Sequence, residues 1–351
     1  MTKNGRTNHN IPLSELAGLS IPSLVSALRL FLNPSAFRQC PRFWHEGIAP
    51  VVHALIQASN TAIINQWLDH GTEVVFVSSF PRSGNTWMRY LLADVLLQTQ
   101  NIPTSTQLPV HPDDLIPEFR GNSILNRLKR CPSWARRPPV AFVKTHVPYP
   151  RVKEILSGSQ WHPFKASNAP ARNCKTLYLY RSPDDALVSF YHLCLREPEW
   201  RSKTTCGIDA FCRKEVSGWA SNISSYLRAA DDGFPIVFIS YEQLLGKAEP
   251  VLAEVLRWVG LPHDKPMVER AVSNMQFNKL QAMEIQENKA RRAGPGQQLF
   301  FRHGRSGSGR VELQESTRQE VLEKTASLMG EINQRQMKQS PNQPQPVAVP
   351  A

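Results

Sequence analysis

Four short apolar runs constrain the fold of this chain more than any other feature of its sequence. They span residues 73–79, 140–144, 175–180 and 235–240, and they are rich in β-branched and aromatic residues without strict alternation of apolar and polar positions. Strands that are covered on both faces have this pattern, whereas strands with one face in water alternate. Helix-like periodicity lies between the runs, and this strand–helix alternation indicates an α/β fold with a parallel sheet.

The predicted architecture is a single three-layer α/β domain over residues 71–334. Its central, mainly parallel sheet has four to five strands and is flanked by helices. Residues 1–70 are punctuated by prolines and are predicted to form an N-terminal extension of helices and loops. Residues 335–351 are rich in Pro and Gln and lack periodicity, which predicts a disordered tail.

The formal net charge of +12 indicates an anionic partner, which could be nucleic acid, an anionic membrane surface or a highly anionic small ligand. Six scattered cysteines without CxxC spacing predict neither a zinc site nor a disulfide framework, and they fit a reducing, cytoplasmic location. The apolar segment 19–32 is interrupted by Pro22 and Arg29 and is too short to span a bilayer. It is predicted to pack on the body, with peripheral membrane contact as the alternative.

The first apolar run leads directly into FPRSGNTW at residues 80–87, where a helix is expected to begin. A helix N-terminus presents unpaired backbone N–H groups and therefore attracts anions. Gly84 lets the backbone close on a ligand, and the hydroxyls of Ser83 and Thr86 can donate hydrogen bonds to its oxygens. Arg82 adds a positive charge. The loop is similar to a P-loop, and the fold is accordingly expected to be P-loop NTPase-like; an ordinary capped turn is the alternative.

This loop resembles the 5′-phosphosulfate loop of the sulfotransferases that use 3′-phosphoadenosine 5′-phosphosulfate (PAPS). The resemblance implies PAPS as co-substrate, PAP as product and no metal. Most cytosolic members carry a lysine that contacts the bridging oxygen, so the resemblance gives Arg82 a catalytic role as well as a binding role. It also implies that Trp87 stacks on adenine, with a core anchor as the alternative. The phosphosulfate contacts that it implies are Arg82, Ser83, Gly84, Asn85 and Thr86.

A second stretch, VKTHVP at residues 143–148, ends the second predicted strand. Strand carboxyl ends in open α/β sheets face the ligand crevice, and histidine titrates near neutral pH, so His146 is placed to take a proton. The stretch is similar to the Lys-Thr-His-hydrophobic-Pro segment of the same family. That resemblance makes His146 the general base and Lys144 a catalytic residue. The alternative is a structural histidine.

A third stretch, residues 178–192, carries Arg181 at a strand end and Ser189 eight residues later. It resembles the family motif in which such an Arg and Ser bind the 3′-phosphate of the nucleotide. Asp184 and Asp185 lie in the first turn of the following helix, and we expect them to cap that turn rather than to take part in catalysis.

The fourth stretch, residues 299–310, alternates Arg and Gly and is predicted to be a loop that can fold over a phosphate. It resembles the family's Arg-Lys-Gly loop, with Arg302, His303 and Gly304 at those positions and His303 in place of the usual Lys. A solvated Arg/Gly loop is the alternative, and nucleic-acid binding is not expected. Weaker matches to the family's nucleotide contacts are Tyr241 and Phe277, which are equally compatible with core positions.

These motifs together predict an enzyme that moves the sulfuryl group of PAPS to a hydroxyl or amine by in-line transfer. A magnesium-dependent nucleotide kinase or NTPase is an alternative. It requires a Lys-Ser/Thr pair after the loop glycine, and this chain has Asn85-Thr86 there. A non-catalytic binder of polyanions is the other alternative, for which His146 would be dispensable.

The acceptor is expected to be a small molecule, a carbohydrate or a lipid, bound by the loops at 99–138 and 195–225. Apolar acceptors would suit the aromatic residues there, namely Trp134, Phe211 and Trp219. An anionic carbohydrate would suit the basic residues, namely Arg120, Arg127, Arg130, Arg136 and Arg137. No nucleic-acid partner is predicted, and the sequence gives no oligomeric state.

Overall fold

The structure is a computed structural model that describes residues 49–104, 110–119, 124, 127, 130, 132–136, 138–149, 173–198, 200–290 and 299–339. Residues 1–48 of the extension predicted over residues 1–70, including segment 19–32, lie outside these ranges. Within the part of the chain described, no helix combines the length and the apolar character that crossing a bilayer requires.

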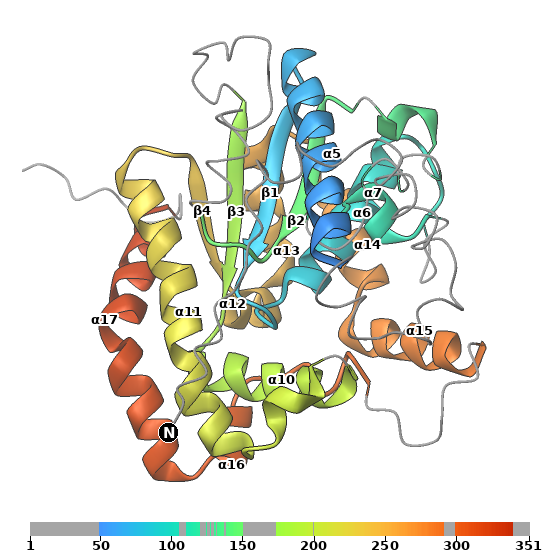
Figure 1. Ribbon diagram of the computed structural model, residues 1–351. Coiled ribbons are helices and arrows are strands. Elements are labelled where there is room, and N and C mark those ends of the chain that lie inside the picture. The colour runs from blue at the N-terminus through green and yellow to red at the C-terminus, as the bar shows by residue number, and fades with distance from the viewer. Residues whose placement is uncertain are drawn as a thin grey trace, which may run out of the picture.

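The centre of the fold is a parallel sheet (Figure 1). Its four described strands are β1 (Glu73–Ser79), β2 (Val140–Thr145), β3 (Cys174–Tyr180) and β4 (Ile236–Ser240), in the order β2-β1-β3-β4. Val77 of β1 aligns with Lys144 on one side and with Leu177 on the other. The predicted α/β fold class is confirmed, and all four predicted strands are present. Because β1 lies between β2 and β3, the carboxyl ends of the three strands meet at one edge of the sheet.

Helices cover both faces of the sheet, as Figure 1 shows. One face packs against α6 (Asn85–Thr99), α13 (Ala248–Val259) and α14 (Lys265–Asn274). The other face packs against α5 (Ala49–Asp69), α11 (Ile208–Asp231) and α17 (Glu315–Gln339). Alternate residues of β1 divide between these layers: Val75 and Val77 face the first, and Val74 and Phe76 face the second. Burial on both faces explains why these strands lack apolar–polar alternation.

The remaining described elements are short or lie at the edges of the sheet. They are α7 (Pro112–Leu115), η2 (Ser133–Arg136), α10 (Pro183–Arg196), η3 (Arg201–Thr204), α12 (Tyr241–Gly246), α15 (Phe277–Ala290) and α16 (Ser308–Glu312). Helices α10 and α12 follow β3 and β4 almost directly, so they begin at the carboxyl edge of the sheet (Figure 1).

The predicted start of a disordered tail at Arg335 is wrong, because α17 continues to Gln339. Arg335 pairs with Asp231 at the end of α11 at 2.6 Å, and the hydroxyl of Tyr180 lies within hydrogen-bond distance of Asn333 Oδ1, at 2.8 Å, and of Gln336 Oε1, at 2.5 Å. These polar contacts hold a helical turn that has no apolar periodicity and that sequence patterns therefore miss. Residues 340–351 lie outside the described ranges.

Leu91 tests the packing of α6 on the sheet. Its side chain is fully buried in the layer that also holds Val75 and Val77. We expect Leu91→Ala to lower the free energy of unfolding by about 2–5 kcal/mol, because it leaves a cavity in a packed core. Urea denaturation measures the change. The control is Val311→Ala, since Val311 is 75% exposed and its truncation is expected to cost less than about 0.5 kcal/mol. Equal effects of the two changes would contradict this packing.

Candidate active site

The loop between β1 and α6 has the backbone of an anion site. Arg82 and Gly84 both adopt left-handed conformations, with φ of 71° and 91°. The conformation at Arg82 costs about 1 kcal/mol for a residue with a side chain. When left-handed residues alternate with a residue of ordinary conformation, successive backbone N–H groups turn toward one concave surface. Helix α6 begins at Asn85, so its unpaired first N–H groups face the same concavity.

Side chains of the loop differ in what they offer a ligand. A Cβ on Gly84 would lie 2.9 Å from the ring of Tyr241, so only glycine fits there. The Ser83 hydroxyl is buried and lacks a hydrogen-bond partner in the described structure, which leaves it available to a ligand. Thr86 is half-buried. The Asn85 amide nitrogen donates to the carbonyl of Val77 at 2.9 Å and so holds β1, while its Oδ1 is buried without a partner among the described residues.

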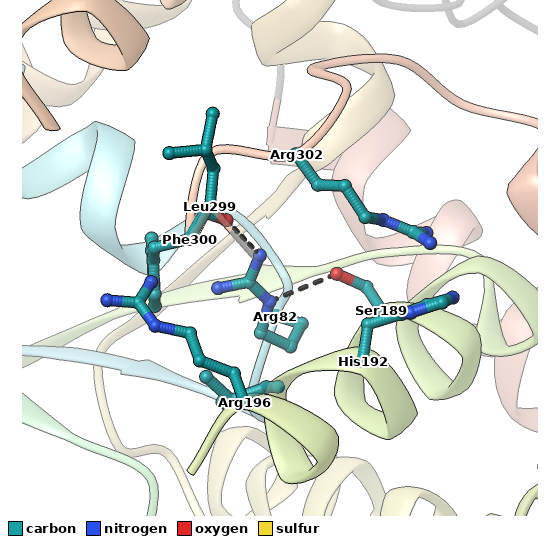
Figure 2. Close-up of a pocket in the computed structure, with 8 residues that line it drawn as sticks. Arg82, Ser189, His192, Arg196, Leu299, Phe300 and Arg302 are labelled. Atoms are coloured by element: carbon teal, nitrogen blue, oxygen red, sulfur yellow. Dashed lines mark hydrogen bonds between the residues drawn. The ribbon is translucent and has the colours of Figure 1, made fainter. Parts of the chain in front are cut away.

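Arg82 extends from the loop toward α10 and the segment 299–302 (Figure 2). Its Nε donates to the hydroxyl of Ser189 at 3.0 Å, and its Nη2 donates to the carbonyl of Phe300 at 2.7 Å. Burial, and after it the positive charges of Arg181, Arg302 and Arg196, lower the pKa of Arg82 to about 10. The group stays charged at neutral pH, in a pocket crowded with cations. The pocket is lined by Arg82, Ser189, His192, Leu193, Arg196, Leu299, Phe300 and Arg302.

Arg181 lies at the end of β3, as the sequence predicted, and its side chain is 8% exposed. It lies 4.5 Å from the ring centre of Tyr241, and its Nη2 donates to the carbonyl of Arg305 at 2.8 Å. Its Nε is buried without a partner among the described residues. Arg181 therefore has a free donor beside the loop that follows Arg302.

Asp185 ties that loop to the sheet. It pairs with Arg181 at 3.3 Å and accepts the backbone N–H groups of Gly307 at 2.7 Å and Gly309 at 2.8 Å. The predicted capping role is therefore wrong for Asp185, which binds a segment more than a hundred residues away in sequence. The fourth motif is a loop only up to Gly307, because α16 begins at Ser308.

Two further carboxylates hold the cations of the pocket. Glu312 accepts from Arg302 at 2.9 Å and from His192 at 2.5 Å. Glu284 of α15 pairs with Arg196 at 2.9 Å and also accepts the N–H groups of Phe300 and Phe301. The sequence motifs did not include these acids. They hold residues 299–302 over the anion loop.

Aromatic side chains predicted to contact a nucleotide gather at the same edge. Gly304 has φ of 59°, and a Cβ there would lie 2.4 Å from the ring of Phe277. Trp87 contacts Tyr241 edge to face at 6.4 Å, and its Nε1 donates to the carbonyl of Met275 at 2.8 Å. His303 is exposed, and partial desolvation, followed by the charges of Arg302 and Arg305, lowers its pKa.

His146 follows β2 on the other side of β1. Its Nδ1 lies 2.9 Å from the carbonyl of Ser79 and 3.2 Å from the hydroxyl of that residue. Because a carbonyl only accepts, Nδ1 carries the proton in this contact and Nε2 of the neutral ring is free to accept one. Burial, and then the charge of Lys144, lowers the pKa of His146 to about 3. The ring is therefore neutral at physiological pH.

Lys144 lies beside His146 but makes its ion pair with Glu118, at 3.0 Å. Burial lowers the pKa of Lys144, with a further lowering from Arg89. Glu118 belongs to a segment that no motif singled out, because it is neither a strand nor a helix.

The predicted acceptor residues separate into groups. Phe211 and Trp219 of α11 are fully buried in the core that α11 shares with α10 and α17, so their prediction as pocket residues is wrong. Arg127 and Arg130 both pair with Asp114, at 3.1 and 2.7 Å. Trp134 is half-buried and packs against the core, Arg136 is exposed, and Arg120 and Arg137 lie outside the described ranges.

The structure thus brings nearly all predicted site residues to one edge of the sheet, in two groups on either side of β1. Towards β3 lie the anion loop, the arginines and the aromatic residues. Towards β2 lie His146 and Lys144. No group of three or more His, Cys, Asp or Glu side chains suited to a metal ion occurs within the described ranges. The expectation of a metal-free site remains a prediction.

Comparison with known proteins gives consistent matches. The family model described as "Sulfotransferase domain" matches residues 72–340. Cytosolic sulfotransferase 7 of Arabidopsis thaliana is 24% identical over 253 residues, which are 68% of this chain and 73% of that protein. Flavonol 3-sulfotransferase of Flaveria bidentis is 24% identical over 277 residues, 73% of this chain and 80% of that protein. A retinol dehydratase solved with retinol and PAP superposes with a TM-score of 0.48 and 18% identity, over 73% of this chain and 81% of that one.

Asp185→Ala tests how far the site depends on one buried carboxylate. We expect it to lower the free energy of unfolding by about 3–5 kcal/mol, because the charge of Arg181 would be left buried without its partner. Thermal and urea unfolding measure this. Glu269→Ala is the matched control, since Glu269 also pairs at i,i+4 spacing, with Lys265 at 3.6 Å, but on an exposed surface. Its loss is expected to cost less than about 0.5 kcal/mol. A cost below 1 kcal/mol for the Asp185 variant would contradict the role given to it.

Proposed function

Because this chain belongs to the sulfotransferase family, the PAPS-dependent enzymes that its motifs resemble, we propose that it moves the sulfuryl group of PAPS to a hydroxyl or amine by in-line transfer. The observation that carries the proposal is the arrangement around β1. A neutral histidine lies against Ser79 at the end of β1, and a cation-lined anion loop continues from that strand. A base and an anion site on opposite sides of one strand end suit transfer of a charged group to an acceptor that must lose a proton.

The residues around the loop fit a doubly phosphorylated donor. Ser83 Oγ and Arg181 Nε are buried without partners in the described structure, and Arg82 adds a buried positive charge. PAPS supplies an activated sulfuryl group on a phosphate leaving group. The backbone from Ser83 to Thr86 would hold its 5′ end, and Arg181, Ser189 and Arg302 would hold its 3′-phosphate.

His146 is the proposed general base. The bond from Nδ1 to the Ser79 carbonyl fixes the tautomer in which Nε2 accepts the acceptor's proton. Lys144 and Arg82 would stabilise negative charge on the leaving oxygen. In this structure Lys144 is the cation adjoining His146, while Arg82 is bonded to Ser189 on the other side of the loop.

The alternatives have less support from the site. For a magnesium-dependent NTPase, the acidic candidate near a strand end is Glu242, and its carboxylate accepts the backbone N–H of Ser182 at 3.2 Å. The loop also lacks the lysine such enzymes require. A polyanion binder would not need the oriented histidine.

A small molecule bearing a hydroxyl is the proposed acceptor, and one relative is named for a flavonol. An anionic carbohydrate has less support, because Arg127 and Arg130 both pair with Asp114. Incubation with PAPS and pooled acceptors, with products identified by mass spectrometry, would identify the acceptor class. A cytoplasmic location is proposed with it, since relatives are named as cytosolic.

Replacing His146 tests the mechanism. We expect His146→Ala to lower kcat by at least about 100-fold, the usual range for loss of a general base, while PAP affinity changes less than about twofold. Turnover is measured with labelled PAPS, and PAP affinity by calorimetry. The control is His70→Ala, since His70 is exposed on the last turn after α5. Transfer at the wild-type rate by the His146 variant would exclude this residue as the base.

The pH dependence of the wild-type rate is a separate test. A base must be unprotonated, and the pKa of His146 is lowered to about 3. We therefore expect kcat/KM to stay level as pH falls from about 7 to about 5, whereas an unperturbed histidine would lose activity below about pH 6.5. Initial rates with an acceptor that does not titrate in this range measure it. An acid limb centred near pH 6.5 would contradict the buried, neutral state of the ring.

A further inference from the structure

Glu118 lies directly beside the end of β2, in the segment that follows α7. Its backbone forms an isolated parallel bridge with Lys144. Phe119 N–H donates to the carbonyl of Lys144 at 2.8 Å, and Lys144 N–H donates to the carbonyl of Pro117 at 2.8 Å. These two bonds extend the sheet by one residue and hold the Glu118 backbone against the catalytic segment.

The side chains of Glu118 and Lys144 complete the contact. Their carboxylate and ammonium lie 3.0 Å apart, and they are 28% and 14% exposed. Attraction between charges is stronger here than at an open surface, because little water intervenes. The other charged or titratable groups acting on this pair come from α6, α7 and the end of β2, and they are Arg89, Asp113 and His146.

Two influences disfavour the charged form of Lys144. Burial favours its neutral amine, and the guanidinium of Arg89 acts in the same direction. Asp113 opposes this, but it is itself paired with Arg89. Glu118 is thus the carboxylate in direct contact with the ammonium.

We propose that Glu118 is a positioning residue that keeps Lys144 charged and fixed beside His146 during sulfuryl transfer. The inference rests on the function proposed above, because it assigns Lys144 a charge-stabilising role in that reaction. A neutral Lys144 could not stabilise negative charge on the leaving oxygen. Glu118 also favours the protonated form of His146, so its effect on the two residues has the same sign.

Glu118→Gln removes the charge and keeps a hydrogen-bond acceptor of the same size. Because the pKa of Lys144 falls when its partner is neutral, we expect the alkaline limb of kcat/KM to move to lower pH by about 1 unit. Any acid limb of kcat/KM caused by His146 would also move to lower pH, further from neutral pH. Glu118→Asp keeps the charge and is expected to shift the limb by less than half as much. A fall in rate without a shift, or an equal shift for both variants, would overturn the proposal.

Glu73→Gln is the matched control. Glu73 pairs with Lys175 at 2.8 Å, with exposures of 24% and 26%, but this pair lies at the amino ends of β1 and β3. The alkaline limb is expected to stay unchanged in this variant, and a shift equal to that of Glu118→Gln would overturn the proposal. Glu118→Leu provides a second neutral variant should the glutamine variant not accumulate as folded protein.

A readout that does not use activity separates this inference from the proposed function. Trace acetylation of Lys144 across a pH series, quantified by peptide mass spectrometry, follows the fraction of neutral amine. We expect the midpoint to fall in Glu118→Gln relative to wild type. If wild type transfers no sulfuryl group from PAPS but this midpoint falls, the proposed function fails and the Glu118–Lys144 coupling stands. If wild type is active and the midpoint is unchanged, the inference on Glu118 fails alone.

Discussion

Repulsion among guanidinium groups at one edge of the sheet is the constraint on which the rest of this site depends. Burial, and after it the positive charges of Arg181, Arg302 and Arg196, depress the pKa of Arg82 there. Like charges in a partly buried region are costly unless they have counter-charges. Asp185, Glu284 and Glu312 supply these charges from α10, α15 and α16. The four arginines outnumber these three carboxylates by one, so the edge keeps a net positive charge, which suits an anionic donor.

The same carboxylates also shape the backbone. Asp185 accepts the N–H groups of Gly307 and Gly309, where the loop passes into α16, and Glu284 accepts two from Phe300 and Phe301. A loop rich in glycine and arginine has little apolar surface of its own with which to fold. Ion pairing and main-chain hydrogen bonding through one acid thus replace the packing that orders other segments. Loss of such an acid would remove the counter-charge of an arginine and the main-chain hydrogen bonds of a loop together.

Much of this architecture could be predicted from the sequence, because buried strands and the residues that end them leave local patterns. The four runs and the residues at the strand ends, including Arg181 and His146, were predicted from such patterns and lie at the same edge. Local patterns do not reveal contacts between residues that are far apart in the sequence. Asp185 looked like a helix cap because its contacts with Gly307 and Gly309 lie outside its own segment. Likewise, the last turn of α17 and the position of Glu118 depend on bonds to distant strands.

In the proposed reaction, the residues on the two sides of β1 have different roles. Arg82 stands where the family usually has a lysine, yet its guanidinium is committed to Ser189 and to the carbonyl of Phe300. An arginine is planar and donates in fixed directions, so it cannot swing between partners as a lysine can. Charge stabilisation on the side of the base then depends more heavily on Lys144 than it would with a lysine in the loop. If the reaction depends on Lys144 in this way, it also depends on the carboxylate that keeps Lys144 charged. The arginine at position 82 and the ion pair between Glu118 and Lys144 are then two parts of the same arrangement.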